Sequence, residues 1–254
     1  MKPYILVTND DGIQAPGIHA LIMELLKFAE ISVVAPLVEK SAVGHAITLS
    51  DPLRVEKFNK NGLWEGLAVS GTPADCVKIA LNAVLNRKPD FVVSGINLGS
   101  NTGINVIYSG TVSAATEGAI SGIPSIAISL TTYTHPKFEV AAKFAGKIVK
   151  NLIENPIESK TLLNINVPNV SEEEIRGVRV ARQGMANFAE EFDKRIDPKG
   201  RTYYWLTGSK NKIEEPDDVD DNLIKENFIT VTPLQFNLTD FSKVKAIEER
   251  IAKL

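Results

Sequence analysis

Several features that mark other protein classes are scarce in this 254-residue chain. Cys76 is its single cysteine, so the chain contains neither an internal disulfide nor a metal site built from several cysteines. No apolar run approaches the roughly 18–20 residues that a transmembrane helix needs. The opening residues MKPYILV include only a strand-length apolar run, too short for the core of a signal peptide. We therefore expect a cytoplasmic protein that does not enter a membrane.

Net positive charge is also lacking. The formal charge of -3 provides no general attraction for nucleic acid or for an anionic membrane surface. Basic stretches interleaved with aromatic side chains, which are typical of nucleic-acid-binding modules, are missing as well. We therefore expect no nucleic-acid polymer as a partner. An anionic substrate would have to be attracted by local groups, and a bound cation is the obvious candidate.

Three familiar catalytic motifs are absent. The chain contains no G-x-G-x-x-G dinucleotide fingerprint, no G-x-x-x-x-G-K-[ST] phosphate loop and no G-x-S-x-G elbow of a serine esterase. Its three histidines, His19, His45 and His135, show no metal-binding spacing. Any metal would therefore be held by oxygen ligands, which favour magnesium or manganese over zinc or copper.

What is present is an alternation of short apolar runs with longer helical patterns. This alternation is typical of βαβ units and predicts an α/β fold, with a Rossmann-like, mainly parallel sheet flanked by helices. Thr72-Pro73-Ala74-Asp75 is a particularly clear helix start, with a hydroxyl cap followed by proline and an early carboxylate. We expect strands at 4–8, 31–35, 91–94, 125–129 and 162–167, and helices at 16–28, 72–85, 111–121 and 138–153.

The character of the chain changes after Arg182. Residues 184–216 are polar, and the apolar stretches 202–206 and 228–232 resemble the two strands of an extended hairpin. Asn237-Leu238-Thr239 then precedes an amphipathic helix that ends near Leu254. We expect a catalytic core over 1–182, a projecting C-terminal β-hairpin arm over 183–234, too poor in apolar residues for a core of its own, and a terminal helix over 235–254.

Asp10 and Asp11 lie where the first strand should end. Ligands of open α/β sheets bind beyond the carboxyl ends of the strands, and the turn at Gly12 can bring the two carboxylates together. Two adjacent carboxylates repel each other unless a cation lies between them, so the pair suits a hard divalent metal. The alternative is that Asp-Asp-Gly only makes a tight turn, and the pair by itself does not decide between these readings.

A Gly/Asn-rich loop follows the predicted strand 91–94 and should reach the same edge of the sheet. In this loop Asn97 and Asn101 offer neutral oxygen ligands or amide donors. The loop is long, extending from 95 to about 109, and loops of this length without regular structure are usually functional. A long surface loop of turn residues is the alternative.

Two further segments carry hydroxyl groups. Ser109 and Thr111 precede an alanine-rich helix, where hydroxyls and free backbone N–H groups can hold a phosphate, although ordinary helix capping explains them as well. After the strand at 31–35, Ser41 offers a hydroxyl ligand, and Lys40 or His45 could contact a phosphate. A lone histidine in such a position is more often structural than catalytic.

Taken together, these segments resemble the survival-protein-E (SurE) family of 5'/3'-nucleotidases. The resemblance follows the family's motif order through about the first two-thirds of the chain, and the last third resembles the family only in style. The matching stretches are ILVTNDDGIQAPGI at 5–18, VVAPLVEKSAVGHAIT at 33–48, SGTPADCVKIAL at 70–81, PDFVVSGINLGSN at 89–101, IYSGTVSAATEGAISGIPSIAIS at 107–129 and LLNINVP at 162–168.

The resemblance implies a Rossmann-like core and one divalent metal ion, Mg²⁺ or Mn²⁺, per subunit. Carried over by motif, the metal ligands are Asp10, Asp11, Ser41 and Asn97. Phosphate contacts are implied at Asn101, Ser109, Gly110 and Thr111. Many family members have Ser-Gly where this chain has Ser41-Ala42, which leaves the exact conformation of that loop open. The resemblance also implies a homodimer or homotetramer that exchanges the C-terminal arm.

The function implied is metal-dependent hydrolysis of nucleoside 5'- and 3'-monophosphates, with short-chain polyphosphate as a further substrate. Asp10, Asp11 and Asn97 would be the catalytic residues, and Asp11 is our choice for the group that orients or deprotonates water. An aspartyl-phosphate route is disfavoured because both carboxylates are committed to the metal. Two alternatives remain: a non-catalytic nucleotide-binding regulator on the same core, and a structural oligomer whose aspartate pair is only a turn.

Overall fold

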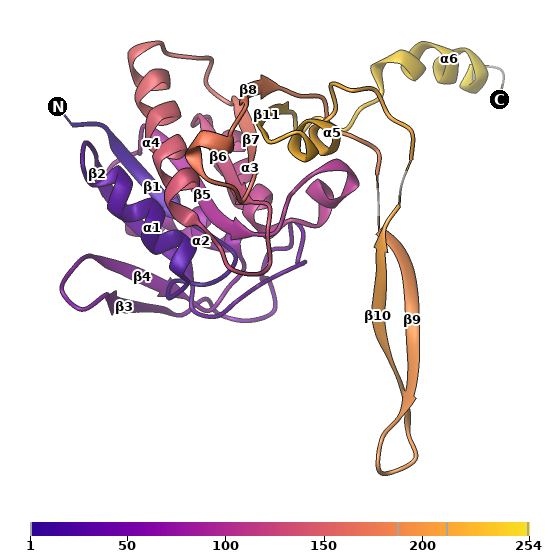
Figure 1. Ribbon diagram of the computed structural model, residues 1–254, viewed down its shortest axis with the longest axis horizontal. Helices are drawn as coiled ribbons and strands as arrows, with labels where there is room; N and C mark the ends of the chain where they lie inside the picture. Colours follow the sequence, from indigo (N-terminus) through magenta and orange to yellow (C-terminus); the bar gives the residue numbers. More distant parts are fainter. Residues whose placement is uncertain (1, 187, 212, 253) are drawn as a thin grey trace.

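The computed structural model describes residues 2–186, 188–211, 213–252 and 254. A nine-stranded sheet runs through this described part of the chain (Figure 1). Its strands, in spatial order, are β3 (Val55–Asn59), β4 (Glu65–Val69), β2 (Glu30–Pro36), β1 (Tyr4–Thr8), β5 (Phe91–Leu98), β6 (Ser125–Leu130), β7 (Leu162–Val167), β11 (Phe228–Leu234) and β8 (Gly177–Val180).

The centre of the sheet is parallel. Strands β4, β2, β1, β5, β6 and β7 run in one direction, whereas β3 pairs antiparallel with β4 and β11 pairs antiparallel with β7. The central strands β1 and β6 are buried over their whole length, as expected for a sheet covered by helices on both faces. Their near-continuous apolar runs reflect this double burial.

Two pairs of helices cover the two faces of the sheet. On one face, α1 (Pro16–Leu25) contacts α4 (Phe138–Glu154), and both pack into the largest apolar core. On the other face, α2 (Pro73–Ile79) contacts α3 (Gly110–Ile120). The small side chains of α3 allow this helix to lie close to the sheet, where Ala115 and Ala119 pack against Ala127.

The shorter elements connect or extend this body. They are a π-helical turn η1 (Ala80–Val84), 3-10 helices η2 (Gly103–Tyr108) and η3 (Glu172–Glu174), and the helices α5 (Asp220–Lys225) and α6 (Phe241–Ile251). Strands β9 (Phe188–Ile196) and β10 (Thr202–Lys210) form a separate antiparallel hairpin. No helix in the described part of the chain combines the length and apolar character that crossing a bilayer requires.

The predicted α/β architecture is confirmed, with corrections in four places. The strand predicted at 91–94 continues to Leu98, and the sequence analysis missed the β3–β4 pair. The pairing predicted for the hairpin is wrong, because residues 228–232 lie in β11 of the main sheet whereas the partner of β10 is β9. The cause is apolar content: Phe228, Ile229 and Val231 are buried against the core. The terminal helix begins at Phe241, later than predicted.

The β9–β10 hairpin projects away from the body, and α6 lies at the opposite side of the molecule from the N-terminus (Figure 1). Both elements expose large apolar side chains. On the hairpin these are Phe192, Ile196, Tyr203, Tyr204, Trp205 and Leu206, and on α6 they are Phe241, Val244, Ile247 and Ile251.

The position of β11 in the body can be tested through its buried side chains. Ile229 is 4% exposed, so Ile229→Ala should lower the free energy of unfolding by about 2–4 kcal/mol through lost burial and the cavity left behind. Leu63→Ala, in an exposed turn, serves as the control and should change it by less than about 0.5 kcal/mol. Chemical denaturation measures both values, and equal small losses would place β11 outside the core.

Candidate active site

Three parallel strands deliver polar residues to one edge of the sheet. Strand β1 pairs with β2 on one side and with β5 on the other, so their carboxyl ends lie next to one another. Asp10 and Asp11 follow β1, the loop containing Ser41 follows β2, and Asn97 is the last residue but one of β5. This is the edge at which open α/β sheets bind their ligands.

An irregularity in β5 sets the direction of Asn97. Ser94 pairs with Ala127 and Asn97 pairs with Ser129, so β5 uses three steps where β6 uses two. One extra residue reverses the alternation of side chains, so Asn97 faces the same side of the sheet as Ser94. Ile96 consequently fills the core on the opposite face. The sequence analysis missed this bulge, since it ended the strand at Ser94.

Asp10 lies directly beneath the first turn of α3. Its side chain is buried, and its Oδ1 accepts a hydrogen bond from the Thr111 hydroxyl. The approach is close enough to require glycine at position 110, because a Cβ there would lie 2.7 Å from the Cβ of Asp10. On the other side, the N–H of Lys40 donates to the carbonyl oxygen of Asp10 at 2.8 Å. This contact places the segment 37–54 between β2 and β3, which we call the Ser41 loop, beside Asp10.

Burial makes both aspartates reluctant to ionise. It raises the pKa of Asp10, and the hydrogen bond from Thr111 only partly opposes this effect. For Asp11, burial and then the charge of Asp10 raise the pKa to about 7. Glu39 adds to the repulsion at both carboxyls. A cation at this position would remove the repulsion and favour the ionised forms.

The remaining predicted metal ligands differ in how they are placed. Asn97 donates through Nδ2 to the Gly99 carbonyl at 2.7 Å, which leaves its amide oxygen as the coordinating atom. Ser41 is exposed, and its hydroxyl donates to Glu39 Oε1 at 2.6 Å. The structure therefore brings Asp10, Asp11 and Asn97 to one edge of the sheet, while the Ser41 hydroxyl is turned toward Glu39.

These donors fit a hard divalent cation by their chemistry. Two carboxylates, an amide oxygen and a hydroxyl are the oxygen ligands that Mg²⁺ and Mn²⁺ prefer. The described residues contain no group of three or more His, Cys, Asp and Glu side chains placed to hold a metal. A site here would therefore depend on the mixed oxygen set, with the two aspartates as its charged members.

The predicted phosphate contacts fall into two groups: some polar groups remain available to a ligand, and others already bond within the protein. Ser109 caps α3 by accepting a hydrogen bond from the Val112 N–H at 3.1 Å, and its own hydroxyl hydrogen stays available to a ligand. Gly110 and Thr111 present the first backbone N–H groups of the helix, which favour an anion. The Thr111 hydroxyl instead donates its hydrogen bond to Asp10.

Asn101 is the centre of a buried hydrogen-bond network. Its Nδ2 donates to the Ser129 hydroxyl at 2.9 Å, and its backbone N–H donates to Asn166 Oδ1 at 2.8 Å. Its carbonyl oxygen accepts hydrogen bonds from the side chains of Asn164 and Asn166, at 2.7 and 3.0 Å. The backbone N–H of Asn101 and one hydrogen of its Nδ2 are thus used in holding the loop to β7 and β6. Nothing in the local sequence pattern indicated this network.

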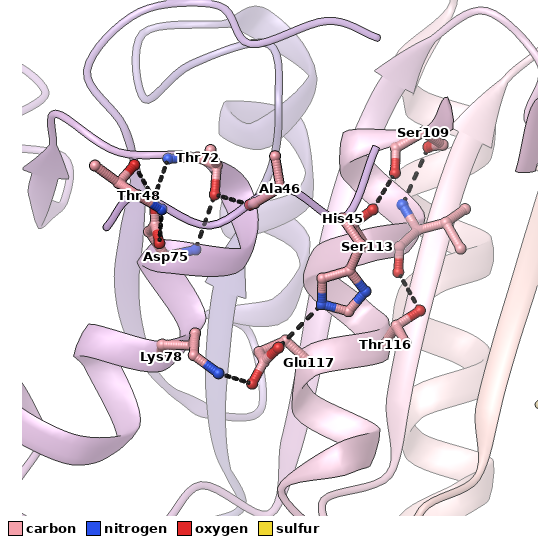
Figure 2. A network of polar contacts seen from close by, with 11 residues as sticks. His45, Ala46, Thr48, Thr72, Asp75, Lys78, Ser109, Ser113, Thr116 and Glu117 are labelled. Atoms are coloured by element: carbon pink, nitrogen blue, oxygen red, sulfur yellow. Dashed lines mark hydrogen bonds and ion pairs between the residues drawn. The ribbon is translucent and has the colours of Figure 1, made fainter. Parts of the chain in front are cut away.

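A second network links the Ser41 loop to α2 and α3 (Figure 2). His45 does not point to a free anion-binding position, because its Nε2 lies 3.0 Å from Glu117 Oε2. Lys78 donates to the other oxygen of Glu117 at 2.8 Å. The hydrogen bond from His45 lowers the pKa of Glu117, and the hydrogen bond from Lys78 lowers it further. Burial opposes this effect but is outweighed. The signal that could have identified Glu117 is a carboxylate in an otherwise small-residue helix.

Asp75 forms the second half of this network. It completes a capping box with Thr72, as the helix-start pattern predicted. Its carboxylate also accepts hydrogen bonds from Thr48, through the hydroxyl at 2.6 Å and the backbone N–H at 3.1 Å. Burial works against ionisation of Asp75, but the hydrogen bonds from Thr48 and Thr72 outweigh it and lower the pKa. The contact with Thr48 joins segments far apart in the sequence.

The fold and the site together define an α/β protein with a pair of adjacent aspartates, one buried and one half-buried, at the carboxyl edge of its sheet, next to a helix N-terminus. A family model described as "Survival protein SurE" matches residues 5–190. The chain belongs to this SurE family.

Relatives match over nearly the whole chain. A protein of Christiangramia forsetii named 5'-nucleotidase SurE is 49% identical, with 96% of this chain and 95% of the relative covered. One of Chlorobium chlorochromatii with the same name is 46% identical, with 97% and 91% covered. The crystal structure of the SurE protein from Aquifex aeolicus is 40% identical, with a TM-score of 0.85 over 98% of this chain and 100% of that chain.

The raised pKa of Asp11 predicts how stability depends on pH without metal. The folded state holds this proton up to about pH 7, whereas an unfolded aspartate releases it near 3.8, so metal-free protein loses stability as pH rises between these values. Asp11→Asn removes this loss and should raise the free energy of unfolding at pH 8 by about 1–3 kcal/mol, and by less at pH 5. Denaturation in chelator measures it, with Asp51→Asn as an exposed control. A destabilised Asp11→Asn protein at pH 8 would contradict the prediction.

Proposed function

We propose that this protein is a metal-dependent phosphomonoesterase that hydrolyses nucleoside 5'- and 3'-monophosphates to nucleoside and phosphate. The observation that carries the proposal is the pair of adjacent carboxylates, the buried Asp10 and the half-buried Asp11, beside the N-terminus of α3. Membership of the SurE family, whose relatives carry the name 5'-nucleotidase, supports the nucleotide as substrate. Short-chain polyphosphate is a further substrate on this proposal.

Asp10, Asp11, Asn97 and Ser41 would hold one Mg²⁺ or Mn²⁺ ion. A divalent cation bound there stabilises the negative charge that develops on the transferring phosphoryl group. Binding by Ser41 requires its hydroxyl to leave Glu39, which is a side-chain rotation in an exposed residue. The raised pKa values of the two carboxyls favour a cation at this site, because each carboxyl is more readily ionised beside a cation.

The chain's own groups orient the phosphate and handle the proton. The Ser109 hydroxyl and the N–H groups of Gly110 and Thr111 bind phosphate oxygens at the start of α3 and hold the ester for in-line attack. Asn101 contributes by fixing the loop between β5 and α3. Asp11 is the group we assign to orienting or deprotonating the attacking water, since it is the less buried of the two aspartates.

Phosphate release from a panel of nucleoside 5'- and 3'-monophosphates and short polyphosphate tests this proposal. With Mn²⁺ or Mg²⁺ the wild type should release phosphate, and chelator should stop the release. Asp10→Asn, Asp11→Asn and Asn97→Ala should each lose more than roughly a hundredfold in turnover, because each removes a group that stabilises or positions charge. Asp51→Asn is the matched control at an exposed aspartate.

The outcomes separate the alternatives. Nucleotide binding without release from any substrate would favour a non-catalytic nucleotide-binding protein. Near-normal turnover in both Asp10→Asn and Asp11→Asn would contradict the assignment of the active site to these two aspartates.

We further propose that the β9–β10 hairpin and α6 form the contacts of a homodimer or homotetramer. Exposed apolar side chains on a projecting hairpin need a partner to be removed from water, and the apolar side chains of α6 repeat at helical spacing. In the described part of α6 no residue is buried. A second copy of the chain is the natural occupant for both surfaces.

Light scattering coupled to gel filtration tests this assembly. The wild type should have two or four times the 27.7 kDa mass of one chain. Trp205→Glu places a charge on an exposed apolar position of β10. It should raise the dissociation constant of the oligomer at least about tenfold and so increase the fraction of monomer. Leu63→Glu provides a control on an exposed turn of the body, and a monomeric wild type would exclude the proposal.

A further inference from the structure

The Ser41 loop, residues 37–54 between β2 and β3, contains neither helix nor strand. Between Ser41 and His45 the backbone turns twice through the left-handed region, with φ of 54° at Ala42 and 57° at Gly44. Such turns have no regular hydrogen-bond ladder to hold them, so contacts with neighbouring elements must define the conformation of this loop.

Backbone contacts hold the Ser41 side of the loop. The N–H of Lys40 donates to the Asp10 carbonyl at 2.8 Å, and the N–H of Gly44 donates to the Tyr108 carbonyl at 3.0 Å. Ser41 lies between these two points. Any movement of the turn from Ala42 to Gly44 would therefore change the position of Ser41 relative to the aspartate pair.

Beyond Gly44, hydrogen bonds that involve side chains hold the loop to α2 and α3 (Figure 2). The imidazole of His45 reaches Glu117 on α3, and the Thr72 hydroxyl donates to the Ala46 carbonyl at 2.7 Å. Thr48 then donates to Asp75 on α2. The loop thus contacts two buried carboxylates in turn, Glu117 and then Asp75, and of its side-chain contacts with α2 and α3 that of His45 is nearest in sequence to Ser41.

Glu117 is suited to act as a fixed anchor for His45. Its side chain is 8% exposed, and one oxygen receives Lys78 while the other receives His45. An ionised carboxylate can only accept, so Nε2 of His45 carries the proton and donates.

We propose that Glu117 is a positioning residue that acts through His45 to hold the Ser41 loop against Asp10 and the start of α3. The proposal rests on the proposed function for the identity of the ligand that Ser41 meets. It assigns to Glu117 no contact with substrate or metal. Its role is to keep the turn from Ala42 to Gly44 in place, so that only the Ser41 side chain must rotate when a cation binds.

Three variants test this role. His45→Ala removes the contact at an exposed position and leaves the fold intact. His45→Gln is the conservative variant, since its amide can still donate to Glu117. Lys78→Met is the matched control, because it removes the other partner of Glu117 without touching the loop.

The first measurement is amide hydrogen exchange at Lys40 and Gly44 by NMR of the metal-free protein. Exchange in His45→Ala should be at least about tenfold faster than in the wild type, should return toward wild type in His45→Gln, and should change by less than about twofold in Lys78→Met. The second is Mn²⁺ affinity by calorimetry, which should fall by about 10–100-fold in His45→Ala, the usual effect of losing a group that orients a ligand.

Turnover of a nucleoside monophosphate is the third measurement. It should fall in parallel with Mn²⁺ affinity at limiting metal and recover at saturating Mn²⁺. Unchanged exchange at Lys40 and Gly44 in His45→Ala would overturn the proposal, and so would faster exchange with unchanged Mn²⁺ affinity. If the wild type neither binds Mn²⁺ nor releases phosphate, the proposed function fails, whereas the exchange data still decide whether Glu117 holds the loop.

Discussion

The rest of the site depends on one electrostatic constraint, the placing of two adjacent carboxyl groups, one buried and one half-buried, at the edge of the sheet. Burial raises the pKa of both Asp10 and Asp11, the charge of Asp10 raises the pKa of Asp11 further, and Glu39 adds to the repulsion at both. A protein that places two acids in such a position loses stability as they ionise, unless a cation or a proton compensates. The neighbouring features follow from this condition. The Thr111 hydroxyl donates to Asp10, the start of α3 lies against it, and Asn97 brings a neutral amide oxygen to the same edge of the sheet.

Close packing of α3 makes this arrangement possible. Helix α3 is built almost entirely from small residues, so it lies near enough to the sheet for its first turn to meet Asp10. Gly110 permits the nearest approach, and the alanines behind it pack on β6. The same helix carries Glu117, whose carboxylate reaches His45 of the Ser41 loop. A single helix therefore contributes the turn to which we assign phosphate binding, a hydrogen bond to the first aspartate and a buried carboxylate that contacts the loop following β2.

Much of this was predictable from local pattern. Apolar runs alternating with helical periodicity indicated the α/β sheet, and Thr72 with Asp75 indicated the start of α2. The pair Asp10-Asp11 after a buried strand indicated an edge site. The bulge in β5 was not predictable, because Gly95 reads as the start of a loop while its strand continues to Leu98. The pairing of β11 was misjudged for a related reason: a short apolar strand does not show which neighbour it will join, and only burial against β7 decides.

The sequence by itself determined the class of fold and the order of its main elements, and it indicated the residues to which we assign the chemistry, because periodicity, capping and turn residues act within a few positions of the chain. The tertiary structure decided which polar groups are committed. It assigned the Thr111 hydroxyl to Asp10, the amide donors of Asn101 to β6 and β7, the Ser41 hydroxyl to Glu39 and His45 to Glu117. Most of these pairs join residues distant in sequence, and a hydrogen bond depends on distance and direction in space, which no local pattern records.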